Sequence, residues 1–202
     1  MHQERAFVGL GGNAGDDVEA TLTAAVHALA ALAGARLSGV SRLYATSPVG
    51  VTDQAEFRNA VVALEVPAGP DADTGALALL LALKSIEKAF GRQVRERWGP
   101  RELDLDLLLF GDHQVRLERP ADARSDDPAR TADVQWLEVP HPSAAERLFV
   151  LAPLADLAPD LMPPGWSESV AAATRRRSHV EGSNAVRPLG AWSEAERRWL
   201  PA

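Results

Sequence analysis

The chain has 202 residues, a formal net charge of −7 and no cysteine. This length suits one well-buried domain with some additional segments. The negative charge argues against a general nucleic-acid or membrane-surface binder, and the lack of cysteine excludes disulfides, a thiol nucleophile and a cysteine zinc site. The sequence shows no signal-peptide pattern and no apolar run long enough to cross a bilayer. We therefore expect a cytoplasmic protein without a membrane or nucleic-acid partner.

The first half of the chain alternates segments with strand and helix periodicity. Apolar residues recur at helical spacing after Asp16 or Asp17, and Gly34 ends that pattern. Thr74 is placed to cap a second helix, which Gly91 terminates. The predicted elements are a strand over residues 6–10, a helix over 18–32, strands over 36–44 and 60–66, a helix over 74–90 and a strand over 103–110. This order favours an α+β fold with helices packed on a mixed sheet.

The second half of the chain has fewer periodic segments. Residues 116–134 are rich in Asp, Arg and Ala and lack periodicity, which predicts an exposed, mobile insertion. Residues 144–157 predict a short helical region, and residues 167–177 predict one more helix. We therefore expect a main domain over residues 1–165 and a C-terminal extension over residues 166–202, to which the sequence assigns no function.

The most informative segment is a strand with two carboxylates. Leucine and aspartate alternate strictly over Leu103–Leu107, and side chains two apart on a strand point to the same face. The leucines therefore face a core, and Asp104 and Asp106 share the opposite face. Neighbouring carboxylates resist ionisation unless a cation lies between them. Mg²⁺ is commonly held by one or two carboxylates together with substrate phosphates, so this strand predicts a magnesium site.

Positive charge gathers just ahead of these aspartates, at Lys84, Lys88, Arg92, Arg95, Arg97 and Arg101. Arginine presents planar donors that match phosphate oxygens, and Trp98 offers an aromatic surface for a flat ring. An isolated pair of aspartates is more often an ordinary strand end. The clustered arginines and Trp98 favour a functional site instead, and they indicate nucleotide-dependent phosphoryl chemistry.

Three further patterns have competing interpretations. Residues 9–14 match a G-x-G-x-x-A dinucleotide fingerprint, but the acidic residue required about 20 positions later is absent. The glycines are better explained by a tight strand-to-helix turn, and an NAD(P)-binding Rossmann oxidoreductase stays an alternative.

Phe57 can stack on the face of a heterocycle, and Asn59 can form hydrogen bonds with its edge. The competing interpretation is a turn in which Asn59 caps its own backbone. His141, between two prolines, is either structural or a donor to a nucleotide.

Five segments in this order resemble the 6-hydroxymethyl-7,8-dihydropterin pyrophosphokinases of folate biosynthesis. They are GLGGNAGD (9–16), TSPVGVTDQAEFRNAVVALE (46–65), IEKAFGR (86–92), RWGPRELDLDLLLFG (97–111) and VPHPSAAERLFVLAPLADLAPDL (139–161). The resemblance implies transfer of pyrophosphate from ATP to the pterin hydroxymethyl group, with release of AMP. It also implies a ferredoxin-like αβα sandwich with a mainly antiparallel sheet, usually monomeric. A non-catalytic pterin- or nucleotide-binding protein is the second alternative.

The resemblance also implies roles for individual residues. Two Mg²⁺ ions would be held by Asp104 and Asp106. The catalytic residues would be Arg92, Arg101, Asp104 and Asp106; the ATP-side residues Glu87, Arg95, Trp98, His141 and Arg147; and the pterin-side residues Thr46, Val49, Phe57, Asn59 and Phe149. The chain departs from the family at Val94, where a second loop arginine is common, so Arg95 is the candidate replacement. Lys84 stands where Gln or His can occur, and no general base is evident.

Overall fold

The computed structural model describes residues 2–47, 53–91, 99–124, 134–182 and 184–201. Its strands are β1 (Gln3–Gly12), β2 (Arg36–Val40), β3 (Leu43–Thr46), β4 (Phe57–Pro67), β5 (Asp104–Phe110), β6 (Val115–Glu118), β7 (Trp136–Val139), β8 (Val186–Ser193) and β9 (Arg198–Pro201). Its α-helices are α1 (Val18–Ala30), α2 (Ala72–Ala89), α3 (Leu148–Leu157) and α4 (Val170–Glu181). Among the residues so described, no helix combines the length and hydropathy needed to cross a membrane.

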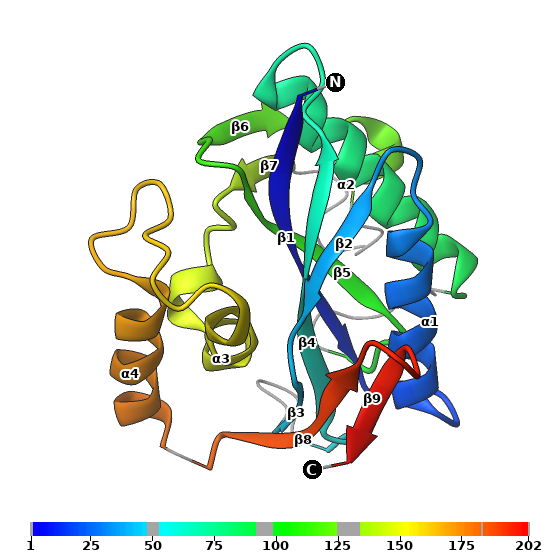
Figure 1. Ribbon diagram of the computed structural model, residues 1–202, viewed down its shortest axis with the longest axis vertical. Coiled ribbons are helices and arrows are strands. Elements are labelled where there is room, and N and C mark those ends of the chain that lie inside the picture. Colours follow the sequence, from blue (N-terminus) through cyan, green and yellow to red (C-terminus); the bar gives the residue numbers. More distant parts are fainter. Residues whose placement is uncertain (1, 48–52, 92–98, 125–133, 183, 202) are drawn as a thin grey trace.

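A seven-stranded sheet forms the centre of the molecule, in the order β5-β1-β4-β3-β8-β9 with β2 also paired to β4. The described pairings are all antiparallel. Helices α1 and α2 cover one face of the sheet, and α3 and α4 lie on the other (Figure 1). Alternate residues of a strand serve the two cores: Leu107 of β5 joins the larger apolar cluster and Leu108 the smaller. The predicted αβα sandwich with a mainly antiparallel sheet is confirmed.

Strand β1 runs further than the sequence predicted. Gly9, Gly11 and Gly12 lie inside it and pair with β4, so the interpretation of these glycines as a turn is wrong. Only after Gly12 does the chain turn, and Gly15 there has a φ of +102°, which glycine adopts without strain. Asp17 caps α1 as expected, through a hydrogen bond from the backbone N–H of Ala20 at 2.9 Å.

Two other local expectations are corrected. The strand predicted over residues 36–44 is two strands, β2 and β3, because Ser41 and Arg42 interrupt it. The cap of α2 is Asp71 and not Thr74: the Asp71 carboxylate accepts the backbone N–H of Thr74 at 2.7 Å.

The predicted insertion over residues 116–134 contains regular structure. Its first residues belong to β6, which pairs with β7 across the insertion. Ala123 is fully buried against the larger apolar cluster. Most of residues 116–124 are exposed, as expected. The strand and the burial of Ala123 were not predicted, because a strand this short leaves no clear periodic signal. The expected mobility stays a prediction. Residues 125–133 lie outside the described part of the chain.

The C-terminal residues join the main sheet. The helix predicted over residues 167–177 is α4, and strands β8 and β9 were not predicted. β8 pairs with β3, and β9 pairs with β8 (Figure 1). Trp199 of β9 packs in the larger apolar cluster, while Val170 of α4 packs in the smaller one. Residues 170–201 therefore share both cores with the rest of the chain and do not form a separate structural unit.

Candidate active site

A row of residues crosses the sheet on the face that α3 covers. Directly opposed residues of antiparallel strands point to the same face, and Gly11 is opposed to Asn59 on one side and to Asp104 on the other. Two residues along, Gly9 is opposed to Asp106. Because the two glycines carry no side chains, no side chain of β1 lies between the amide of β4 and the carboxylates of β5.

The two carboxylates of β5 lie as the alternating sequence predicted. Asp104 and Asp106 are half-buried on the face of α3, while Leu105 is fully buried on the opposite face. Arg101 donates from Nη1 to Oδ1 of Asp104 at 2.9 Å, so the predicted arginine and aspartate are in contact. Within the described residues, no group of three or more acidic or histidine side chains forms a metal site. Two carboxylates suit Mg²⁺, which fills its other positions with water and phosphate oxygens.

Glu87, expected on the ATP side, is enclosed beneath β5. Its side chain is 1% exposed, and Oε1 accepts the backbone N–H of Leu105 at 2.7 Å. Lys84 donates from Nζ to both of its carboxylate oxygens at 2.9 Å. The buried charge is therefore paired and hydrogen-bonded, as a buried carboxylate requires. Its partner on β5 is the residue between the two aspartates, so Glu87 sets the position of that strand.

Asn13 joins two segments of the site, and the sequence interpretation gave it no role. Its side chain is buried; Oδ1 accepts the backbone N–H of Arg101 at 2.9 Å, and Nδ2 donates to Gln54 Oε1 at 2.9 Å and to Ala55 O at 3.0 Å. An amide can donate and accept at once, which suits a bridge between two loops. The sequence contains one signal for this role, an asparagine directly after the glycine-rich strand.

His141 lies beside the two aspartates. Its backbone N–H donates to Leu108 O of β5 at 2.8 Å, and its ring Nδ1 accepts the backbone N–H of Ser143 at 3.2 Å. Burial lowers the pKa of His141, and the negative charge of Asp106 only partly opposes that shift. The neutral ring therefore carries its proton on Nε2, which makes His141 a hydrogen-bond donor on this face of the sheet.

The residues predicted to bind the pterin lie on the same face. The buried Asn59 donates from Nδ2 to Oγ1 of Thr46 at 2.8 Å, so it lies in a strand and does not cap its own backbone. Phe57 is opposed to Thr46 in the pairing of β4 with β3. Phe149 of α3 packs against the smaller apolar cluster, with the Arg147 guanidinium 5.7 Å from its ring centroid. Four of the five predicted pterin residues therefore share one side of the sheet.

Four predicted site residues lie outside the described part of the chain: Val49, Arg92, Arg95 and Trp98. Their roles stay predictions.

Comparison with known proteins agrees with this geometry. A model of the 7,8-dihydro-6-hydroxymethylpterin-pyrophosphokinase family matches residues 7–159. The chain belongs to this family. The enzyme named 2-amino-4-hydroxy-6-hydroxymethyldihydropteridine pyrophosphokinase in Pseudomonas aeruginosa is 42% identical over 161 residues, which cover 80% of this chain and 85% of that one. The protein of the same name in Methylorubrum extorquens is 40% identical over 177 residues, covering 88% and 97%.

Solved structures support the fold. The chain matches wild-type HPPK-DHPS from Plasmodium falciparum with pteroate at a TM-score of 0.72 and 14% identity, over 99% of this chain and 48% of that one. This chain thus spans about half the length of that protein. A Rossmann oxidoreductase is not favoured, because its nucleotide site needs a parallel sheet and the pairings described here are antiparallel.

Proposed function

We propose that this family member transfers the β,γ-pyrophosphoryl group of ATP to the hydroxymethyl group of 6-hydroxymethyl-7,8-dihydropterin, in folate biosynthesis. The hydroxymethyl oxygen bonds to the β-phosphorus of ATP, the bond from that phosphorus to the oxygen of the α-phosphate breaks, and AMP leaves. The hydroxyl loses its proton, and the product is the dihydropterin diphosphate. The family assignment and the face that unites Asn59 with two carboxylates support this proposal.

The row across β4, β1 and β5 is the observation that carries the proposal. Neighbouring strands lie about 4.8 Å apart, so the backbones of Asn59 and Asp104 are roughly 10 Å from each other. A pterin whose edge meets Asn59 reaches across Gly11 with its hydroxymethyl group toward Asp104 and Asp106. The acceptor oxygen and the phosphates of ATP then meet above β5.

The pterin is held by stacking and by hydrogen bonds to its edge. Phe57 and Phe149 supply aromatic faces on the same side of the sheet, and rings of this kind favour offset stacking. Thr46 fixes the amide of Asn59 through the bond to Nδ2, which leaves Oδ1 and the second N–H for the heterocycle. The backbone near Thr46 and Val49 completes the edge contacts that the resemblance implies.

Positive groups and metal meet the phosphates. Asp104 and Asp106 would hold two Mg²⁺ ions, which when bound neutralise phosphate charge. Arg101, already oriented by Asp104, donates to phosphate oxygens as their charge shifts during transfer. His141 donates from Nε2, and Arg147 adds a positive charge beside it. Arg92, Arg95 and Trp98 act from the segment outside the described residues, with Arg95 serving as the second loop arginine.

The decisive test is the identity of the nucleotide product. Purified protein with ATP, Mg²⁺ and 6-hydroxymethyl-7,8-dihydropterin should form AMP in equal amount to the pterin diphosphate. The matched control is 6-methyl-7,8-dihydropterin, which lacks the acceptor hydroxyl and should yield no AMP. Accumulation of ADP would reject pyrophosphoryl transfer even if ATP is consumed. Binding of NAD(P)H without turnover of ATP would favour the oxidoreductase.

We also propose that the protein acts as a monomer in the cytoplasm. The described residues assigned to ATP, metal and pterin all come from one chain, so the site needs no second copy. Sedimentation at micromolar concentration with both substrates present should give the mass of one chain. A mass of two chains that persists on dilution, with unchanged activity, would contradict this proposal.

A further inference from the structure

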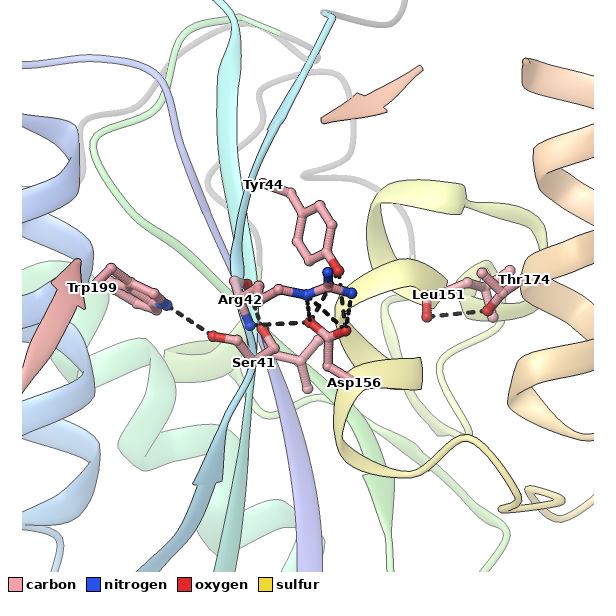
Figure 2. Close-up of polar contacts among 8 residues, drawn as sticks. Ser41, Arg42, Tyr44, Leu151, Asp156, Thr174 and Trp199 are labelled. Atoms are coloured by element: carbon pink, nitrogen blue, oxygen red, sulfur yellow. Dashed lines mark hydrogen bonds and ion pairs between the residues drawn. The ribbon is translucent and has the colours of Figure 1, made fainter. Parts of the chain in front are cut away.

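Strand β9 and helix α3 contact two adjacent residues from opposite faces of the sheet: β9 contacts Ser41 and α3 contacts Arg42 (Figure 2). On one face, Trp199 of β9 donates its indole N–H to the carbonyl oxygen of Ser41 at 2.8 Å. On the other face, Asp156 of α3 accepts the backbone N–H of Arg42 at 3.0 Å. Ser41 is itself fixed to β4, because its hydroxyl accepts the backbone N–H of Val61 at 2.9 Å. The junction between β2 and β3 is thus held from three directions.

Asp156 accepts hydrogen bonds from the junction and from β3. The Arg42 guanidinium donates from Nη2 at 2.6 Å and from Nε at 3.1 Å, and the Tyr44 hydroxyl donates at 3.0 Å (Figure 2). Burial raises the pKa of Tyr44, and the charge of Asp156 raises it further, so the phenol stays a donor. A charged carboxylate with several donors makes stronger bonds than neutral groups do. Asp156 therefore ties the end of α3 to the start of β3.

Helix α4 holds the other end of α3. The hydroxyl of Thr174 of α4 donates to Val170 O of its own helix at 2.7 Å and shares that proton with Leu151 O of α3 at 3.3 Å (Figure 2). Glu181, the last residue of α4, accepts the backbone N–H of Leu148 at 3.4 Å, and Arg177 holds that carboxylate in an ion pair at 2.6 Å. The first turn of α3 carries Phe149 between these contacts. Its position over the sheet is therefore fixed at both ends of the helix.

Strand β8 pairs with β3 on the side opposite to β4. Val186 is opposed to Thr46, and Pro188 is opposed to Tyr44. Without β8, β3 would be an edge strand with one row of unpaired backbone groups. Thr46 depends on the position of β3, and it orients Asn59. The C-terminal segment thus contacts both elements that bring the pterin-side residues together, namely α3 and β3.

We propose that residues 170–201, acting with Asp156, form a positioning element for the pterin substrate. They set the distance between Phe149 on α3 and the Thr46–Asn59 pair on the sheet, and so determine the KM for the pterin. The metal ligands lie on β5, three positions from β3 in the strand order, and Arg147 lies at the end of α3 away from Asp156. Changes at Asp156, Tyr44 and Trp199 should therefore leave the KM for ATP unaltered. The inference rests on the proposed function, because it concerns how that function's second substrate is held.

Three conservative variants test the positioning element. Asp156→Asn keeps the shape and removes the charge that collects the donors; Tyr44→Phe and Trp199→Phe each remove one hydrogen bond and keep the ring. We expect the pterin KM to rise at least fivefold in Asp156→Asn and about threefold in the two ring variants. The KM for ATP should stay within twofold. The matched control is Asp160→Asn, an exposed carboxylate just beyond α3, which should leave both KM values unchanged.

The outcomes separate this inference from the function on which it rests. If the wild-type protein forms no AMP from ATP and the pterin, the proposed function fails, and the positioning element fails with it. If the wild type is active and the variants keep the wild-type pterin KM, only the positioning element is rejected. An equal rise of both KM values, or a fall in kcat that follows the melting temperature, also rejects it, because general loosening of the fold predicts those results.

Discussion

The two halves of the proposed site are assembled in different ways. Around β5 the components are close in the sequence: Arg101 precedes Asp104 by three residues, and Glu87 lies on the helix before them. Around the pterin pocket, α3 is joined to β3 by Asp156 and Arg42, which are 114 positions apart. The phosphate-binding half is therefore encoded locally, and the pterin-binding half depends on how distant segments pack.

The halves also differ in where their supporting charges lie. The Lys84–Glu87 pair under β5 is largely buried, with side chains 13% and 1% exposed. The Arg42–Asp156 pair, which supports the pterin half, has side chains 52% and 15% exposed. Breaking a buried pair leaves a charge out of water and is costly, whereas the exposed guanidinium of Arg42 can be solvated when its partner is lost. We therefore expect changes to the Lys84–Glu87 pair to reduce stability and activity together, and changes at Arg42 to act mainly through the position of α3 relative to β3.

The largest effect is expected from the carboxylates themselves. Asp104→Ala and Asp106→Ala should each lower kcat at least about 1,000-fold, because a lost metal ligand leaves several kcal/mol of phosphate charge unneutralised. The melting temperature should change little, since both side chains are half-buried at the surface of the sheet. Asp112→Ala, 97% exposed just after β5, is the control and should be fully active. Near-normal turnover of either site variant at saturating Mg²⁺ would contradict the assignment.

The support beneath β5 gives the next largest effect. Glu87→Gln should lower the free energy of unfolding by about 2–4 kcal/mol, somewhat less than a fully buried pair costs, because Lys84 retains some contact with water. It should also reduce kcat, since the bond to Leu105 N–H weakens. The double variant Lys84→Met/Glu87→Gln removes both charges and should recover part of the lost stability in urea unfolding. If the loss of stability in the double variant equals the sum of the losses in the two single variants, the two side chains do not stabilise each other.

The variant Gly11→Ala tests whether the position between Asn59 and Asp104 must lack a side chain. A Cβ added there would lie 3.1 Å from Oδ1 of Asn59, closer than ordinary contact. Gly11→Ala should therefore displace the amide that reads the pterin edge and raise the pterin KM about tenfold, or roughly 1.4 kcal/mol. The KM for ATP should change by less than twofold. A selective rise in the KM for ATP would show that this part of the row belongs to the nucleotide instead.

The sequence predicted the geometry of β5 correctly, while the roles of its residues stay predictions. Strict alternation placed Asp104 and Asp106 on one face, and the structure agrees. Glu87 was expected on the ATP side, and its direction toward β5 was not predictable: a helical residue facing a strand and one facing a substrate have the same spacing. Burial beneath Leu105 is a property of packing between α2 and β5, which the sequence does not contain as a local pattern.

The distant half could not be predicted from local signals. Strand β8 contains Pro188 and Gly190, which argue against a strand. Pro188 is tolerated because the pairing of β8 with β9 begins only at Gly190, so one side of β8 is free of a partner at that position. The bond from Trp199 to Ser41 joins residues 158 positions apart, and no periodicity reports such a contact.

The smallest effect is expected from the segment between β6 and β7. From composition alone, removal of residues 121–132 should hardly lower the free energy of unfolding. In the structure, however, Ala123 is fully buried and Arg124 is paired with Glu118 at 2.7 Å. Deleting only residues 126–131 should therefore change the free energy of unfolding by less than about 0.5 kcal/mol, because shortening a polar connection alters the entropy of chain closure only slightly.

The longer deletion, of residues 121–132, should cost about 2 kcal/mol or more, because it removes Ala123 from the core and opens contacts of β6. Urea unfolding of both variants measures the difference, and turnover should be unchanged in the shorter one. Equal, small losses would mean that the packing of Ala123 contributes nothing. A large loss from the shorter deletion would mean that the polar residues themselves support the domain. The expected difference between the two deletions would instead identify residues 121–124 as a third region whose contribution depends on packing, through Ala123.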